Sequence, residues 1–445
     1  MRSVRAYLLW SILILGIFLL VYFSDQSNFP LTIGTFSLSF FAYVLIYLTR
    51  NDLSLKYWEY LAFIAFLIPI FSTPTLSPDF YRFLWDGELT TLGIHPYAYT
   101  PDQIMELDLV KGNSYMQELY SNITELSRRH YSPYPTINQV YFIIPAWLTD
   151  SILPALIIMR MLILATMIIG YRFIKKLLVQ TSIQPTKALL LLFNPFLIVE
   201  VMDNLHFEGV MMAWLVIGIY YLFNQQWIKA SFFWGIAVAV KLTPLILLPA
   251  LLRYLKLKRT IIVYLLISFF SVAITMIMLW PSYASNVFRS IRLYFNNFEF
   301  NSSILQFFEW IIEPFTEYGP IVFAGPITVV LGTIGILIIA WRKPIDSPIQ
   351  VLIRFMWIYV VYLLFATTVH PWYIILPLIF SLFSTNRGVL AWSFLIMLSY
   401  GFYHWEGKWV SNLLVSLEYL LLAVCLLFGK KIDHQLKKFS KRFSA

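Results

Sequence analysis

Apolar runs long enough to cross a membrane recur along the whole chain. Residues 7–23 read YLLWSILILGIFLLVYF, and residues 260–280 read TIIVYLLISFFSVAITMIMLW. A helical crossing needs about 20 consecutive, mostly apolar residues. Of the 445 residues, 60% are hydrophobic and 12% are charged, whereas a soluble domain carries about 25% charged residues. We therefore predict an all-α, polytopic integral membrane protein with one transmembrane domain over residues 1–429.

The apolar runs predict about 11–14 crossings. The predicted spans are 7–23, 31–49, 57–72, 152–171, 188–201, 207–223, 231–240, 242–254, 260–280, 319–341, 350–368, 371–384, 388–404 and 410–429. The pair 231–240 and 242–254 fits either two short crossings or a re-entrant hairpin. The first run follows basic residues, as in a signal peptide, but no small-residue cleavage site follows it, so we expect it to be retained.

Lysine and arginine residues are divided unevenly between the two sides of this layout. With a cytoplasmic N-terminus, the outer side holds few of them, whereas the inner loops and the basic tail at 430–445 hold many, as expected from the positive-inside rule. The outer cations are Arg82, Lys111, Arg128, Arg129, Lys241, Arg289, Arg292 and Lys408, while Arg160 and Arg354 fall inside spans. We expect both termini in the cytoplasm, with the tail lying beside anionic lipid. The net charge of +9 therefore does not indicate a nucleic-acid partner.

The outer side is acidic. Its acidic residues are concentrated in two long segments, residues 73–137 and 281–318. The first is rich in Tyr, Pro and Trp, so we expect an ordered loop with short amphipathic helices. A connection of this length is usually functional or disordered.

Several functional classes lack support in the sequence. Cys425 is the single cysteine, which excludes an intramolecular disulfide and a CxxC site. The sequence contains neither a P-loop nor a G-x-G-x-x-G motif, so nothing indicates ATP-driven transport or Rossmann nucleotide-sugar chemistry.

The most informative motif is LSPDFYRFLWDGELTTLGIHPYAYTP at the start of the first outer loop. Ser77 suits an N-cap and Pro78 the first helical position. A helix starting there places Asp79, Arg82 and Asp86 on one face, with Arg82 between the carboxylates. An ionised Asp79 in the first turn, favoured by the helix dipole, is what a general base requires. An interfacial helix solvated by its charges is the alternative.

This motif, followed by YSPYPTINQVYFIIP after the loop, resembles the first periplasmic loop of polyprenol-phosphate-sugar-dependent glycosyltransferases of the GT-C superfamily. The similarity is to the bacterial mannosyltransferase branch that includes glycosyltransferase family 87. The family pattern is roughly Asp-x-Tyr-Arg-Tyr-x-Trp-Asp-Gly, then Gly-x-Asn-Pro-Tyr, then Tyr-Pro-Pro. This chain departs at Phe83, at His95 and at Thr136. The resemblance implies that Arg82, Asp86 and Tyr97 bind substrate.

A second motif, FNPFLIVEVMDNLHFEGVMMAW, places Asp203, Asn204, His206 and Glu208 at the outer end of two spans. His206 and Glu208 are two residues apart and would not share a helical face, so a metal site built from this pair is not indicated. The family has a similar Asn-x-His-x-Asp/Glu element lining its cavity. This implies that Asn204, His206 and Glu208 contact sugar; a polar loop between spans is the alternative.

Two further motifs carry candidate phosphate ligands. In GIAVAVKLTPLILLP, Lys241 lies where two short apolar segments meet, and in ATTVHPWYIILPL, His370 precedes a span. A cation between broken helices suits a lipid phosphate, although a snorkelling lysine would look the same. His370 could hydrogen-bond a phosphate or simply cap the span. The resemblance extends to both, with Lys-x-x-Pro and His-Pro-Trp-Tyr elements, and implies substrate contacts for Trp372.

Together, the motifs and the resemblance predict an inverting transfer on the outer face of the inner (plasma) membrane. The expected donor is a polyprenyl-phosphate sugar, with mannose the first expectation, and the acceptor is a hydroxyl of an envelope glycan or glycolipid. Asp79 would be the base and Lys241 and His370 would stabilise the leaving phosphate. No metal is required, though the acidic loop could bind one. Transfer of another lipid-linked sugar or oligosaccharide, and a flippase or secondary transporter, remain alternatives; Arg160 and Arg354 would favour transport.

Overall fold

A computed structural model describes residues 2–108, 110–297, 299–405 and 408–444. Within these ranges the chain is helical throughout and forms no β-strand beyond one isolated bridge between Phe300 and Thr368. Seven helices are long and apolar enough to cross a membrane, or eight if a bent pair counts as one span. The chain is therefore an all-α polytopic membrane protein, as predicted.

The first half of the chain begins with a helical hairpin and then leaves the bundle. Its helices are α1 (Arg2–Phe23), α2 (Phe29–Leu48), α3 (Leu55–Leu67), α4 (Asp79–Thr91), α5 (Pro101–Met105), α6 (Ser114–Asn122), α7 (Glu125–Arg128), α8 (Thr136–Ala146), α9 (Ile152–Gln180), α10 (Leu189–Leu192), α11 (Pro195–Ile198) and α12 (Glu208–Phe223).

The second half contains further spans and a second excursion. Its helices are α13 (Trp227–Val240), α14 (Leu248–Tyr254), α15 (Leu257–Thr275), α16 (Pro281–Asn297), α17 (Ile304–Ile312), α18 (Ile321–Trp341), α19 (Pro348–Phe365), α20 (Ile375–Phe380), α21 (Gly388–Leu395) and α22 (Lys408–Ser444).

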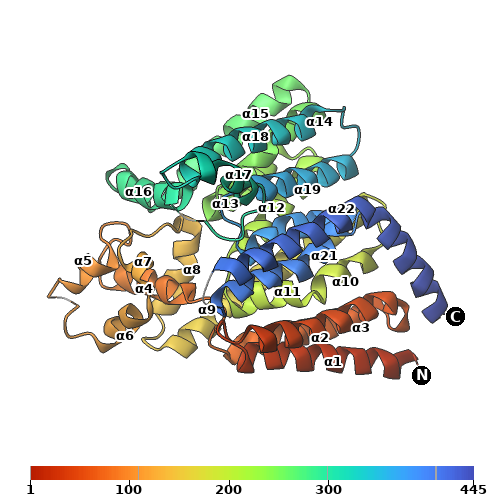
Figure 1. Ribbon diagram of the computed structural model, residues 1–445, viewed down its shortest axis with the longest axis horizontal. Coiled ribbons are helices and arrows are strands. Elements are labelled where there is room, and N and C mark those ends of the chain that lie inside the picture. Colours follow the sequence, from red (N-terminus) through yellow and green to blue (C-terminus); the bar gives the residue numbers. More distant parts are fainter. Residues whose placement is uncertain (1, 109, 298, 406–407, 445) are drawn as a thin grey trace.

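The two ends of the molecule differ in construction. Figure 1 shows both termini at one end of the bundle, while helices α4 to α8 form a compact group at the opposite end, with α16 nearby. Residues 73–137 and 281–318 thus form ordered helical layers at the end remote from the termini. Helix α8 was not predicted, because Pro145 interrupts its apolar pattern.

A broken helix lies in the predicted span 188–201. Asn194 caps α11 by accepting a hydrogen bond from the Phe196 backbone, and Pro195 occupies the first helical position. The segments before and after this break are bent by 60°, because proline cannot continue the hydrogen-bonding ladder. The second segment ends in a π-helical turn, Val199–Asp203, a feature often found at functional sites.

Residues 231–254 form two separate short segments. Helix α13 starts at Trp227 and packs against α12 and α15, whereas α14 packs against α18 and α19. Lys241 joins them in an extended conformation, followed by the 3-10 turn Thr243–Leu247. A re-entrant hairpin would require the two legs to pack along each other, so this arrangement favours two short segments.

The first outer layer depends on a close crossing between α4 and α8. A β-carbon at Gly87 would lie 2.3 Å from the carbonyl oxygen of Phe142, which is backbone and cannot move aside. Only glycine permits this approach. The crossing fixes α4, and with it Asp79, against the bundle.

The C-terminal basic tail continues α22 through Ser444 instead of forming a separate segment. Asp433 binds Arg387, with an Nη2–Oδ1 distance of 2.5 Å, and Lys437. These ion pairs attach the tail to the residues preceding α21. The sequence analysis assigned Arg292, Lys408, Lys441 and Arg442 to sides of the membrane. Their side chains lie outside the described part of the chain.

Candidate active site

Asp79 opens α4 at the junction between the outer layer and the bundle. The helix begins at Asp79 with Pro78 as its N-cap, one residue later than predicted, and the Asp79 backbone N–H donates to Ser77 Oγ at 3.4 Å. The side chain keeps partial exposure. Loss of hydration, together with the negative charge of Glu208, raises the pKa of Asp79 to about 6, although Lys241 acts in the opposite direction.

Lys241 lies between carboxylates and an aromatic ring. Its ammonium group donates to Glu208 Oε1, which lies in the first turn of α12, and stands 3.9 Å from the centre of the Tyr373 ring, within cation–π range. We call Asp79, Glu208, Lys241 and Tyr373 the Lys241 cluster. Glu208 therefore partly neutralises the positive charge of Lys241.

A row of aromatic rings adjoins the Lys241 cluster. Trp372 stacks on His206 with ring centres 3.5 Å apart and on His370 at 4.5 Å, and His370 stacks on Phe300 at 4.9 Å. We call these four residues the aromatic stack. Phe300 belongs to the second outer segment and is held beside Val369 by a backbone hydrogen bond of 2.8 Å. Sequence reasoning did not identify Phe300, because nothing in its local pattern indicates this pairing.

Both imidazoles of the aromatic stack are neutral near pH 7. Burial, followed by the positive charge of Lys241, lowers the pKa of His370 to about 3. Burial also lowers the pKa of His206, with His370 and Lys241 contributing. A protonated His370 beside a phosphate is therefore not supported, and Lys241 supplies the positive charge nearest these rings.

A buried carboxyl group, that of Glu200, lies behind His206. Glu200 Oε2 lies 3.5 Å from His206 Nε2, Tyr400 donates to Glu200 Oε1 at 2.9 Å, and Asn204 donates to Glu200 Oε2 at 3.2 Å. The predicted residue Asn204 is completely buried, so it orients this carboxyl group. Sequence reasoning missed Glu200 and Tyr400; the ionisable Glu200 within an apolar span was the available signal.

Arg82 and Asp86 lie behind the exposed part of the site. Arg82 Nε donates to Asp86 Oδ1 at 2.8 Å, and both side chains are at least 97% buried. Arg82 also donates to the carbonyl oxygens of Ser127 and His130, while Asp86 accepts from Ser132 and from Gln139. The pair thus fastens α4 to the segment that precedes α8. Although Arg82 shares a predicted face with Asp79, the hydrogen bonds of its guanidinium go to Asp86, Ser127 and His130.

Tyr97 has a comparable position. Its side chain is 1% exposed, its hydroxyl donates to the Tyr134 carbonyl at 2.7 Å, and its own carbonyl accepts from Asn286. These contacts order the outer layer and leave no free hydroxyl for a ligand.

The two arginines inside spans also have structural partners. Arg160 is buried and donates to the carbonyls of Ile70, Ser72, Met202 and Asp203 at 2.6–3.1 Å. Arg354 donates to the carbonyls of Ala340 and Lys343. Arg160 therefore stabilises the backbone around the broken helix, and neither contact set indicates a transport pathway.

The four motifs meet at one place although they are far apart in the chain. Ring stacking, an ion pair and charge interactions link Asp79, His206, Glu208, Lys241, His370 and Trp372 into one group of side chains. Among the described residues, no group of three or more His, Cys, Asp or Glu side chains could hold a metal ion.

A helical membrane bundle with carboxylates, a cation and stacked aromatic rings grouped at one place agrees with the architecture expected of a membrane-embedded glycosyltransferase of the GT-C type. Comparison with known families supports this class. Residues 19–256 match the family described as alpha-(1→6)-mannopyranosyltransferase, N-terminal domain, and the chain belongs to this family of mannosyltransferases. No curated protein matches the chain.

Proposed function

We propose that this protein transfers mannose from a polyprenyl-phosphate donor to a hydroxyl of an envelope glycan or glycolipid. The observation that carries the proposal is the Lys241 cluster, where Asp79 and Glu208 lie close enough to one cation for their charges to interact. A base and a phosphate-binding cation are the two groups that this reaction requires.

Asp79 acts as the general base. Its carboxylate takes the proton of the acceptor hydroxyl as that oxygen attacks the anomeric carbon of the sugar. A pKa of about 6 leaves the group ionised near neutral pH yet basic enough to accept a proton, which is the useful range for general-base catalysis. The helix N-terminus at Asp79 favours the ionised form.

Lys241 binds the departing phosphate. As the bond between the anomeric carbon and the phosphate oxygen breaks, negative charge grows on the polyprenyl phosphate, and a cation at this point stabilises the transition state more than the ground state. Glu208 holds Lys241 in place before the donor arrives. Two carboxylates and one cation leave a net negative charge, so donor binding is coupled to the protonation of Asp79.

The aromatic stack provides a sugar-binding surface. Trp372 and His370 are partly exposed and lie parallel, with an interplanar angle of 4°. Neighbouring rings of the stack cover the faces of both, so their exposed edges are what a bound sugar would meet. The neutral imidazole of His370 can donate to a hydroxyl or a phosphate oxygen. His370 therefore assists by hydrogen bonding.

A single displacement inverts the anomeric configuration. If the product is α-linked, as the name of the family states for its members, the donor must carry a β-linked sugar phosphate. The asymmetry of lysine and arginine supports a site outside the cytoplasm, where a lipid-linked sugar is available without a nucleotide. The plasma membrane, with both termini inside, is the expected location.

The test is sugar transfer by purified protein in detergent, with no ion gradient. Synthetic polyprenyl β-phosphomannose and an α-(1→6)-mannoside acceptor should give an α-linked product, whereas the α-phosphomannose donor should give none. Transfer from GDP-mannose, or product formation from the α-donor with retained configuration, would contradict the donor or the mechanism. Lipid movement across vesicles without transfer would support the transporter alternative.

A further inference from the structure

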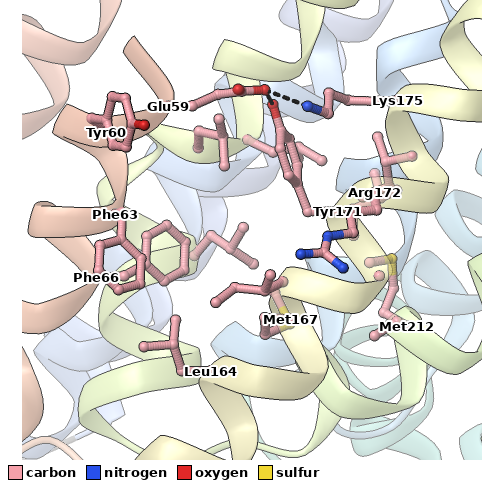
Figure 2. Close-up of a pocket in the computed structure, with 18 of the residues that line it drawn as sticks. Glu59, Tyr60, Phe63, Phe66, Leu164, Met167, Tyr171, Arg172, Lys175 and Met212 are labelled. Carbon is pink, nitrogen blue, oxygen red and sulfur yellow. Dashed lines mark hydrogen bonds and ion pairs between the residues drawn. The ribbon is translucent and has the colours of Figure 1, made fainter. Parts of the chain in front are cut away.

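A large cavity lies away from the candidate active site, between α3 and α9. Its volume is about 700 Å³, within the range of about 300–1,000 Å³ that is typical of ligand sites. Its walls are mainly apolar and include Phe63, Phe66, Leu164, Met167, Leu197 and Met212. Figure 2 shows these side chains around the hollow, with the ribbon of α9 crossing it.

The cavity has a polar rim at one end only. Glu59 on α3 accepts hydrogen bonds of 2.7 Å from Tyr171 and from Lys175 on α9, as drawn in Figure 2. This bridge joins the two helices at the rim, while the apolar walls lie farther along them. Because Lys175 neutralises Glu59, the bridge adds no net charge to the cavity.

Two further cations remain at this rim. Lys56 and Arg172 are exposed and line the cavity. Arg172 has no hydrogen bond, ion pair or ring partner in the part of the chain that the structure describes, and Figure 2 shows its guanidinium pointing toward the hollow near Met167. The rim therefore has a net positive charge, and Arg172 has free donors for an anion.

The rim lies near one end of each of the two helices. Arg172 is eight residues before the end of α9 at Gln180, about 12 Å along a helix, and Lys56 lies in the first turn of α3. Both helix ends lie at the end of the bundle that carries the termini (Figure 1). Tyr60 and Phe63, which line the cavity, are 58% and 44% exposed, so the cavity is open beside α3.

We propose that this cavity binds one anionic glycerophospholipid from the leaflet at the terminal end of the bundle, with its phosphate on Arg172 and Lys56 and an acyl chain along the apolar walls. Basic pockets between membrane helices recognise anionic head groups in this way. Apolar walls alone would accept any chain, so the charge of the rim selects the anionic lipid. The bound lipid would fill the gap between α3 and α9 beneath the Glu59 bridge and support the broken helix that packs there.

The experiment is native mass spectrometry of the purified, delipidated full-length protein titrated with phosphatidylglycerol or with phosphatidylcholine of the same acyl chains. Each cation is expected to contribute about fivefold in affinity. Wild type should retain phosphatidylglycerol preferentially, and Arg172→Gln combined with Lys56→Gln should remove most of this preference. Lys176→Gln is the matched control, because Lys176 is on the same helix but lies over the rings of Phe173 and Tyr220. It should leave the preference unchanged.

A photoactivatable phosphatidylglycerol then identifies the site directly. In wild type, the labelled residues should map to α3 and α9. The yield of labelling should decrease in the variant Met167→Trp, whose larger side chain fills the cavity without changing its charge. Thermal unfolding of each variant confirms that it is folded. Inorganic phosphate should not compete. Equal retention of the two lipids by wild type, displacement of the labelled lipid by equimolar polyprenyl phosphate, or burial of this face in a dimer of the chain would each overturn the proposal.

Discussion

Lys241 and Glu208 form an ion pair across the ends of α13 and α12, and the pair lies within electrostatic reach of Asp79. The pair explains how a lysine at the end of an apolar helix remains oriented without a ligand. It also links the charge state of the base to the cation that receives the phosphate, so the three residues should respond to mutation as a unit.

Asp79→Asn should reduce transfer by about 100-fold or more, because the amide cannot accept the acceptor's proton. Donor binding should be nearly unchanged. We would measure single-turnover transfer and donor affinity on the same preparation. Near-wild-type turnover would remove Asp79 from the mechanism.

The pH profile should report Asp79. Since its pKa is about 6, transfer should fall about tenfold per pH unit below that value and reach a plateau above it. Glu208→Gln removes a charge that raises this pKa, so the midpoint of the remaining activity should move to lower pH. A midpoint unchanged by this substitution would show that another group is titrating.

The same pKa shift makes Asp79 costly for stability. Folding raises the pKa of Asp79 from 3.8 to about 6. The protonated form therefore favours the folded state, and this contribution to stability is lost as the pH rises through about 6. Above that pH, Asp79→Asn should be more stable than wild type by up to about 3 kcal/mol, and the difference should disappear below about pH 4. Thermal unfolding of wild type and Asp79→Asn in detergent at pH 4 and pH 7.5 checks the sign. A melting temperature of Asp79→Asn below that of wild type at pH 7.5 would contradict the prediction.

Lys241→Gln should lower both turnover and donor affinity, because it removes a charge that acts most strongly on the departing phosphate. Lys241→Arg should rescue partly, since Arg binds phosphate with a different shape. Transfer kinetics normalised to folded protein separate this role from an interfacial anchor. If Lys241 were only an interfacial anchor, Lys241→Gln would keep the turnover and the donor affinity of wild type.

The orientation can be tested with single cysteines in a Cys425→Ser background. Ser114→Cys lies at the exposed start of α6 and should react with a membrane-impermeant maleimide in intact cells. Lys258→Cys, exposed at the opposite end of the bundle, should react only after lysis. The reverse pattern would invert the topology and remove the extracytoplasmic donor site.

Sequence alone predicted the class of this protein and the seven described helices that are long and apolar enough to cross a membrane, because apolar length is a property of local sequence. It also identified Asp79, His206, Glu208, Lys241, His370 and Trp372, whose motifs resemble a known family. Only the tertiary structure decided how these residues are paired. Helical periodicity predicts which residues share a face but not which face meets another helix. The hydrogen bonds from Arg82 to Ser127, from Tyr97 to Tyr134, from Lys241 to Glu208 and from Tyr400 to Glu200 join residues that are 33 to 200 positions apart. Their partners became evident only when the packing of the bundle brought them together.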